Sequence, residues 1–411
     1  MQKFEKHSPV VVTEVTTKHE LRQFMQYPNR LYADNPNYIP SFYGDDLSDW
    51  TPGKNPAFDY CEARCWLAWR DGEIVGRIGA ILSHKANDKF GTHRMRFSQV
   101  DFVDDSEVSA ALFGMVERWA REKGCDQVHG PLGFTDMDRE GMLVEGFDRR
   151  SLFFTNYNAP YYLEHLTRLG YRKDVDWIEY RITVPAPGST EAERLHKLSE
   201  FILKRKNLHV ATVHHKSEYG PFVRQVFELV NAAYAPLYGV VELSDEQIER
   251  YANKFIPLVD PDFVCFVLDE QDKLVAFGVT ALDPSVALKH SDGRLFPFGW
   301  AGVLNDLHHS DTLIMLLTAV RPDLQTEGIN AVMMDHVCQS CNRHGVQFAE
   351  TGPMLELNDH ILAQWKRLEK EQHKRRRCFI KDLNHDVNAA NTAAAAQAEA
   401  PETAPAAESA E

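Results

Sequence analysis

The stretch Gln325-Thr326-Glu327-Gly328-Ile329-Asn330-Ala331 decides the fold, because it follows the apolar run Thr312–Val320 and precedes a helix-like stretch, 331–343. This order predicts a strand, a glycine turn and a helix. The first turn of a helix has unpaired backbone N–H groups and a partial positive charge, so it can hold a pyrophosphate without a charged side chain. Gly328 would let the backbone approach such a ligand closely. One glycine before a helix is also typical of a plain turn, and the motif alone leaves both interpretations open.

The same stretch resembles the acyl-CoA-binding signature of the GNAT acyltransferase superfamily, Q/R-x-x-G-x-G/A, with Asn330 in place of the last small residue. The resemblance extends over residues 211–383. It implies that the glycine turn binds the CoA pyrophosphate and that a backbone N–H in 318–320 holds the thioester carbonyl. The residues that it assigns to acyl-CoA are Thr318, Val320, Gln325, Thr326, Glu327, Gly328, Ile329, Asn330 and Asn358.

A second part of the resemblance follows the predicted strand 346–350. Asn358 stands seven residues before Trp365, on a helix-like stretch, 359–368. GNAT enzymes have an Asn and a Tyr at this spacing, where the Asn contacts the CoA arm and the Tyr often protonates the leaving thiolate. An indole N–H is a hydrogen-bond donor without useful acidity, so Trp365 cannot take over that role. The resemblance therefore leaves the acid unassigned.

The composition is that of an ordinary globular protein long enough for two domains. The chain has 411 residues, of which 44% are hydrophobic and 26% charged, and its net charge is -15. This acidic balance argues against nucleic acid as a partner. No apolar run is long enough to span a membrane, and the amino terminus has no apolar segment typical of a secretory signal. We therefore expect a cytoplasmic protein.

The seven cysteines are scattered and predict reduced, mostly buried thiols. Cys338 and Cys341 form a C-x-x-C inside a predicted helix without a second pair, so no metal site is expected. A basic run, 373–377, precedes the predicted final strand. It is interpreted either as a contact with CoA phosphates or an anionic lipid surface, or as a solvated loop.

The chain divides near Pro185-Ala-Pro-Gly-Ser-Thr190, where two prolines and a glycine interrupt regular structure. A similar order of helices and strands occurs on both sides, and a helix over 17–26 is expected to stop before Pro28. The predicted fold is α/β (α+β) with two tandem GNAT-like domains, each a mixed, mostly antiparallel sheet flanked by helices. The proposed domains are 1–184, 185–387 and a disordered Ala/Glu/Pro-rich tail, 388–411.

The two halves differ at the position of the glycine turn. In the first half this position reads Asp101-Phe-Val-Asp-Asp105, whose carboxylates would repel a pyrophosphate. The first half is therefore expected to shape an acceptor site or to support the second half. Its Gly-, Asn- and aromatic-rich loops, together with the connection 234–241, are interpreted either as the lining of that site or as structural packing. The acceptor residues proposed are Tyr234, Tyr238, Asp136 and Glu140.

Acyl transfer from a thioester to an amine needs a general base. Glu350 and Glu356 are proposed as catalytic, with Asp136 and Glu140 as further candidates, while a structural salt bridge is an equal alternative for Glu350. A family of similar bacterial proteins, some implicated as ceramide-forming N-acyltransferases, shares the loops of the first half. The expected function is transfer from acyl-CoA or acetyl-CoA to a small-molecule or lipid amine, including a long-chain sphingoid-type amine reached by peripheral contact with the inner membrane surface.

Two other function classes are weighed against this one. A non-catalytic acyl-CoA- or ligand-binding module fits Trp365 and Asn330, which both depart from the enzyme pattern. A Fem-like transferase that uses aminoacyl-tRNA fits the tandem arrangement, but the acidic balance of the chain counts against it.

Overall fold

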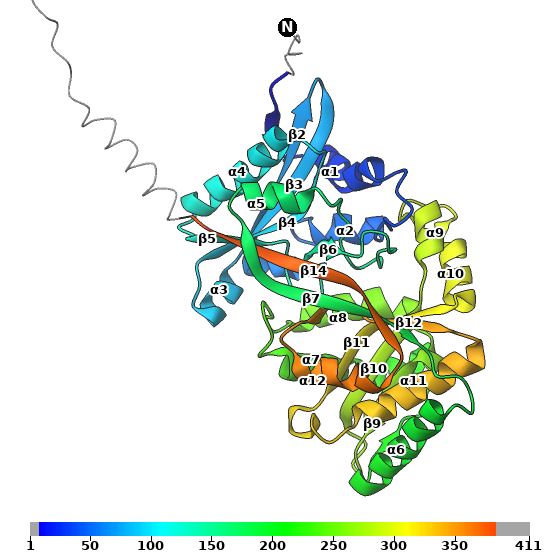
Figure 1. The fold of residues 1–411 in the computed structure, drawn as a ribbon. Helices are drawn as coiled ribbons and strands as arrows, with labels where there is room; N and C mark the ends of the chain where they lie inside the picture. The colour runs from blue at the N-terminus through cyan, green and yellow to red at the C-terminus, as the bar shows by residue number, and fades with distance from the viewer. Residues whose placement is uncertain (1–7, 384–411) are drawn as a thin grey trace, which may run out of the picture.

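A computed structural model describes residues 8–383, whose strands form one continuous 14-stranded sheet (Figure 1). The order across the sheet is β1-β2-β3-β4-β5-β14-β7-β12-β11-β10-β9-β8, with β6 paired to β14 and β13 to β7. The strands are β1 Val11–Glu14, β2 Cys61–Arg70, β3 Glu73–Ser83, β4 Arg94–Phe102, β5 Gln127–Gly130, β6 Met142–Glu145, β7 Arg172–Thr183, β8 His209–Val210, β9 Val264–Leu268, β10 Leu274–Leu282, β11 Thr312–Val320, β12 Phe348–Glu350, β13 Met354–Leu355 and β14 Lys370–Asp382. The predicted tail, 388–411, lies outside the described residues.

Helices cover both faces of this sheet (Figure 1). They are α1 Lys18–Leu31, α2 Tyr43–Asp49, α3 His84–Phe90, α4 Ser106–Glu122, α5 Tyr162–Arg168, α6 Thr190–Lys206, α7 Gly220–Tyr234, α8 Asp245–Phe255, α9 Ser285–His290, α10 Gly299–His309, α11 Asn330–His344 and α12 Asp359–Ala363. Within residues 8–383, no helix combines the length and apolarity needed to cross a membrane.

Alternating side chains of the strands explain this layering. In the first half, Trp66 packs with α4, and its neighbour Leu67 packs on the other face with α1. In the second half, Phe266 packs with α7 and α8, whereas the adjacent Val267 packs with α6 and α11. Both halves are therefore three-layer α/β/α units, which confirms the predicted fold class.

Two long strands join the halves, and they run side by side through the middle of the molecule (Figure 1). β7 begins in the first half and pairs through Arg181–Thr183 with β12 of the second. β14, the last described strand, lies between β5 and β7. The proposed division at 184/185 therefore falls directly after β7, and we propose that β14 is a strand shared by both halves.

The basic run 373–377 does not form a loop, and both interpretations of it from the sequence were wrong. It lies within β14, where Lys374 is 1% and Arg376 0% exposed. Lys374 and Arg376 pair with the buried Glu179 of β7 at 3.4 and 2.5 Å. Arg375 and Arg377 both pair with Asp176, also on β7. Acidic partners on the neighbouring strand, which cannot be recognised from local sequence, allow these cations to be buried.

Glu179 is held as a carboxylate in this network. Burial alone would raise its pKa, but the charges of Arg376 and Lys374 outweigh that effect and place the pKa below its usual value. Two charges removed from water interact strongly, and removing one of them leaves the other without compensation.

Helix α1 also differs from the prediction, because it continues through Pro28 to Leu31. Proline has no N–H, so the carbonyl four residues earlier, that of Phe24, loses its helical partner. The buried guanidinium of Arg77 donates to this carbonyl at 2.9 Å. A tertiary hydrogen bond thus replaces the missing helical bond.

We predict that Arg376→Met destabilises the protein by about 3–5 kcal/mol, because Glu179 loses its closest cation inside the sheet. Denaturant unfolding followed by circular dichroism measures this loss. Arg149→Met is the control, since the Arg149–Glu371 pair has side chains 37% and 53% exposed and such pairs contribute under about 1 kcal/mol. Equal losses of stability in the two variants would contradict the view that the buried Arg376–Glu179 pair stabilises the sheet. If Arg376→Met does not fold, Arg376→Met combined with Glu179→Leu should recover folded protein.

Candidate active site between the two halves

The centre of the second half is an opening between strands β11 and β12. The two strands are parallel and pair only from Thr312 to Ile314. From Met315 onward, β11 has no partner on that side among the described strands. The register between β10 and β11 shifts at the same place, leaving Leu316 as a bulge. Bulges often occur beside active sites because they redirect backbone groups.

Two cavities lie on the two faces of the sheet and meet at this unpaired edge. The α11 cavity is bounded by α11, β10 and Leu195 of α6. The junction cavity is bounded by α7, by the loop 133–140 of the first half and by the segment 351–358. The residues that line both are Met315, Leu317, Thr318, Gln364 and Trp365. The two cavities are therefore neighbours that share part of their wall at this strand edge.

The glycine turn leads to the open end of the α11 cavity. Gly328 has a φ of 81°, the left-handed region that glycine adopts without strain. No side chain caps the first turn of α11, and Asn330 in that turn lines the cavity. The N–H groups of Ala331 and Val332 donate to the carbonyls of Gly328 and Ile329 at 2.9 Å, and no described side chain caps this end of the helix.

The predicted acyl-CoA residues divide into backbone and side-chain contributors. The side chains of Val320 and Ile329 are buried in the core. Gln325 donates to the carbonyl of Val320 at 3.3 Å, and Glu327 pairs with Lys206 of α6 at 2.6 Å. Thr326 is exposed. In this turn the backbone is therefore the available binding surface.

The corresponding position in the first half is closed by the protein's own groups. Asp105 caps α4 by accepting hydrogen bonds from the N–H groups of Glu107 and Val108. Tyr161 donates to the carbonyl of Phe102 at the end of β4, and the N–H of Phe102 donates to Tyr162 at 2.8 Å. A carboxylate thus occupies the helix terminus where a phosphate would bind.

The junction cavity brings together the four predicted acceptor residues, which come from two distant parts of the chain. Asp136 and Glu140 lie on the first-half loop, whereas Tyr234 and Tyr238 lie at the end of α7 and in the segment after it. The cavity encloses about 880 Å³, including its open mouth, which suits a small-molecule ligand. Aromatic and apolar side chains, including Trp177, Leu237 and Leu355, form most of its wall.

The two carboxyl groups in this cavity are unusual. Neither receives a side-chain hydrogen bond from another described residue. Burial raises the pKa of Asp136 to about 6. Burial, followed by the charge of Asp136, raises the pKa of Glu140 well above its usual range. Burial therefore makes both carboxyl groups harder to ionise than carboxyl groups in water.

Tyr234 links this pair to the unpaired edge of β11. Its hydroxyl donates to the carbonyl of Thr318 at 2.8 Å. Burial raises the pKa of Tyr234 to about 12, and the charge of Asp136 adds to that shift. Asp136 is thus within electrostatic reach of the hydroxyl that contacts Thr318.

The hydroxyl of Tyr238 lies in a group of potential metal ligands. One ligand atom each from His129, Asp174 and Cys378 lies within 4.8 Å of the others. The Tyr238 hydroxyl donates to Asp174 and is 3.0 Å from His129 and 3.5 Å from the sulfur of Cys378. Burial raises the pKa of the Cys378 thiol, which disfavours the thiolate that a metal needs. We interpret this group as a hydrogen-bonded support for Tyr238.

Asn358 and Trp365 close the opening from the side of α12. The Asn358 side chain caps α12 by accepting from the N–H of Ile361 at 3.3 Å, and the residue lines the junction cavity rather than the α11 cavity. Trp365 is 5% exposed and donates to the sulfur of Met354 at 3.2 Å. Its ring therefore acts as a wall between the two cavities.

Glu350 and Glu356, proposed as catalytic from the sequence, lie outside the lining of both cavities. Lys374 donates to Glu350 at 3.2 Å, and burial raises the pKa of Glu350 against the opposing effect of that charge. Glu356 pairs with Lys173 at 2.5 Å and with Arg375 at 3.1 Å. Both are thus already engaged by cations.

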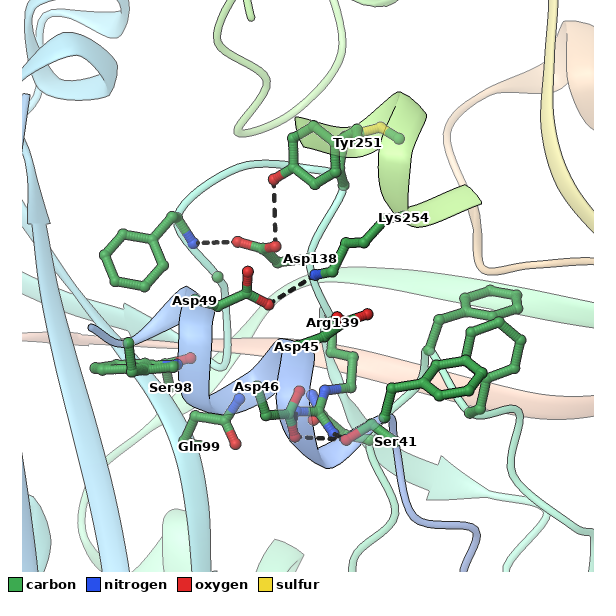
Figure 2. Close-up of a pocket in the computed structure, with 18 of the residues that line it drawn as sticks. Ser41, Asp45, Asp46, Asp49, Ser98, Gln99, Asp138, Arg139, Tyr251 and Lys254 are labelled. Carbon is green, nitrogen blue, oxygen red and sulfur yellow. Dashed lines mark hydrogen bonds and ion pairs between the residues drawn. The ribbon is translucent and has the colours of Figure 1, made fainter. Parts of the chain in front are cut away.

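A third cavity lies behind the loop 133–140, and its network fixes that loop (Figure 2). Asp138 accepts from the N–H of Phe134 at 2.8 Å and from the hydroxyl of Tyr251 at 3.3 Å. Arg139 donates to Asp46 of α2 at 2.7 Å. Asp136 and Glu140 face the junction cavity, whereas Asp138 and Arg139 line the opposite side.

Comparison with known proteins extends this picture, although no family model matches the chain. Protein YghO of Escherichia coli is 27% identical over 379 residues, which cover 91% of this chain and 95% of that protein. The bacterial ceramide synthase of Caulobacter vibrioides is 29% identical over 299 residues, 71% of this chain and 75% of the relative.

Among solved structures, a tandem GNAT protein from the clavulanic acid biosynthesis pathway superposes with a TM-score of 0.52. The superposition covers 91% of this chain and 98% of that one, at 12% sequence identity. At such low identity the likeness concerns the fold alone. The chain therefore has the fold of a tandem GNAT protein.

Proposed function

We propose that this protein transfers an acyl group from acyl-CoA to an amine. The proposal rests mainly on two cavities that share a wall at the unpaired edge of β11. The α11 cavity lies beside a helix terminus without a side-chain cap, and the junction cavity contains two carboxyl groups. Donor and acceptor would then approach from opposite faces of the sheet. Holding two reactants in this way removes much of the entropic barrier to their reaction.

The donor fits the α11 cavity. The backbone of 325–330 and the first turn of α11 would hold the pyrophosphate, and the cavity beyond Asn330 would take the pantetheine arm. Backbone groups of β11 from Met315 to Val320 are free of a strand partner on the side of β12. They would bind the arm and polarise the thioester carbonyl, as preorganised N–H donors do in acyl transfer.

The acceptor fits the junction cavity. Its aromatic and aliphatic walls suit an apolar chain, and the carboxyl pair suits an ammonium group. The relative from Caulobacter vibrioides is a bacterial ceramide synthase by name. We therefore propose a long-chain sphingoid-type amine as the acceptor.

The alternative is a binding module without turnover. Trp365 lines the junction cavity, and in the sequence resemblance it takes the place of the GNAT acid, which favours this alternative. The carboxyl pair favours the enzyme, because a module that only binds has no need for a buried group that titrates near neutral pH. An enzyme would consume acyl-CoA, whereas a binding module would leave it unchanged.

We predict that the protein releases CoA when palmitoyl-CoA and sphinganine are both present. Free thiol measured with a disulfide reagent follows the reaction, and all seven cysteines of the protein are buried. Acetyl-CoA with sphinganine and palmitoyl-CoA with spermidine test the chain lengths of donor and acceptor. Palmitoyl-CoA that raises the melting temperature without being consumed with either amine would favour the binding module.

We also predict that Gly278→Leu weakens acyl-CoA binding at least about tenfold without lowering stability. Gly278 lines the α11 cavity opposite Thr318, and a Cβ there would meet Met333 at an ordinary distance of 3.7 Å. A leucine would therefore fill the space proposed for the pantetheine arm. Isothermal titration with palmitoyl-CoA measures the effect. Gly114→Ala, on the exposed face of α4, is the control, and unchanged binding by Gly278→Leu would remove the α11 cavity from the donor site.

A further inference from the structure

We propose that Asp136 is the general base of this reaction, so that the first half supplies the catalytic group of the second. The proposal rests on the acyl-transfer function proposed above. It gives the first half a chemical role although its own glycine-turn position is closed by Asp105 and Tyr162.

Asp136 shares a cavity with the strand that would hold the thioester. It lines the junction cavity together with Leu316, Leu317 and Thr318 of β11, the stretch that the thioester would contact. Tyr234 links Asp136 to β11. Its hydroxyl donates to the Thr318 carbonyl, and the charge of Asp136 contributes to its raised pKa. An amine placed between them lies beside both the base and the carbonyl that it attacks.

The carboxylate of Asp136 has oxygens that can accept a proton from a ligand. A base must have a free lone pair, and no other side chain donates to Asp136 within the described residues. Glu350 and Glu356, by contrast, are engaged by Lys374 and by Lys173. Both residues also lie outside the lining of the two cavities, so neither is placed to take a proton from an amine held there.

The charged groups around Asp136 also suit a general base. The charged or titratable groups that face Asp136 are Asp138 and Glu140 on its own loop, Arg96 on β4, Lys89 on α3, Tyr234 on α7 and Tyr251 on α8. Arg96 is bound to the carbonyls of Gly133 and Gly239, and Lys89 to those of Ala235 and Val240, so neither cation pairs directly with the carboxylate. Burial outweighs both cations and brings the pKa of Asp136 to about 6. This value is close to the working range of a general base at neutral pH.

The step can be written with atoms and charges balanced. The amine nitrogen forms a bond to the thioester carbon, and the C–S bond breaks with its electron pair leaving on sulfur as the CoA thiolate. Asp136 accepts the proton that the ammonium group loses to become the attacking amine, and the second proton lost by the nitrogen passes to the leaving thiolate to give the CoA thiol. Burial and the charge of Asp136 raise the pKa of Glu140, which favours its protonated form and limits repulsion between like charges in the cavity.

The cavity on the far side of the loop explains how Asp136 is held in place (Figure 2). Asp138 is fixed by the N–H groups of Phe134 and Thr135 and by Tyr251 of the second half. Arg139 is fixed by Asp46 and Ser41. These contacts anchor residues on both sides of Asp136, and Tyr251 is a positioning residue.

Asp136→Asn tests the proposal, because it keeps the shape of the side chain and removes its ability to accept a proton. We expect kcat to fall about 100-fold or more, while the shift in melting temperature caused by palmitoyl-CoA is unchanged. In the wild type, kcat/KM with palmitoyl-CoA and sphinganine should rise with pH through about 6, the pKa of Asp136. Asp136→Glu should retain a larger part of the rate than Asp136→Asn.

Two further variants test whether the effect is specific to Asp136. Glu140→Gln should lose less than Asp136→Asn, about tenfold at most, because an amide imitates a protonated carboxyl. Asp148→Asn is the control, since its side chain is 84% exposed. Wild-type turnover that survives in Asp136→Asn with the same pH profile would overturn the role of Asp136 and leave the acyl-transfer function standing. No turnover by the wild type would overturn both.

We predict that Tyr251→Phe lowers kcat by about tenfold with little change in KM for palmitoyl-CoA. The loop 133–140 loses the hydroxyl that lies 2.7 Å from Thr135 and 3.3 Å from Asp138. Tyr43→Phe is the matched control, because the Tyr43 hydroxyl makes no hydrogen bond within the described residues. Equal rates in Tyr251→Phe and Tyr43→Phe would exclude this positioning role.

Discussion

The buried ion pair between Arg376 on β14 and Glu179 on β7 is the interaction on which the rest of the structure depends. Both side chains are 0% exposed, and the pair lies where the sheet passes from one half to the other (Figure 1). Burying two charges is costly unless they meet with good geometry, so this pair specifies which strands may be neighbours. The continuous sheet then fixes the first half against the second.

A fixed junction allows one site to be built from two halves. The second half provides an unpaired strand edge and an uncapped helix terminus. The first half provides the carboxyl pair Asp136 and Glu140, and its cations Arg96 and Lys89 bind carbonyls of the connection after α7. The first half, where Asp105 caps the corresponding helix terminus, thus forms one wall of the junction cavity.

The sequence was informative where a feature is local. The strand, glycine turn and helix around Gly328 could be predicted because turn and capping preferences act over a few residues. The fold class followed from the repeated order of such elements. The course of β14 could not be predicted, since Glu179, the acidic partner that Lys374 and Arg376 share, lies almost 200 positions earlier in the chain.

The candidate site was predictable to a similar degree. Asp136, Glu140, Tyr234 and Tyr238 were selected from the sequence, and the structure places all four around one cavity. Glu350 was selected because it ends a strand near the turn, a criterion that says nothing about Lys374 beside it. A structure determined with bound CoA tests the central claim most directly. We expect the CoA sulfur at the edge of β11 near residues 315–318, between the α11 and junction cavities. CoA bound away from this edge would contradict the proposed donor site.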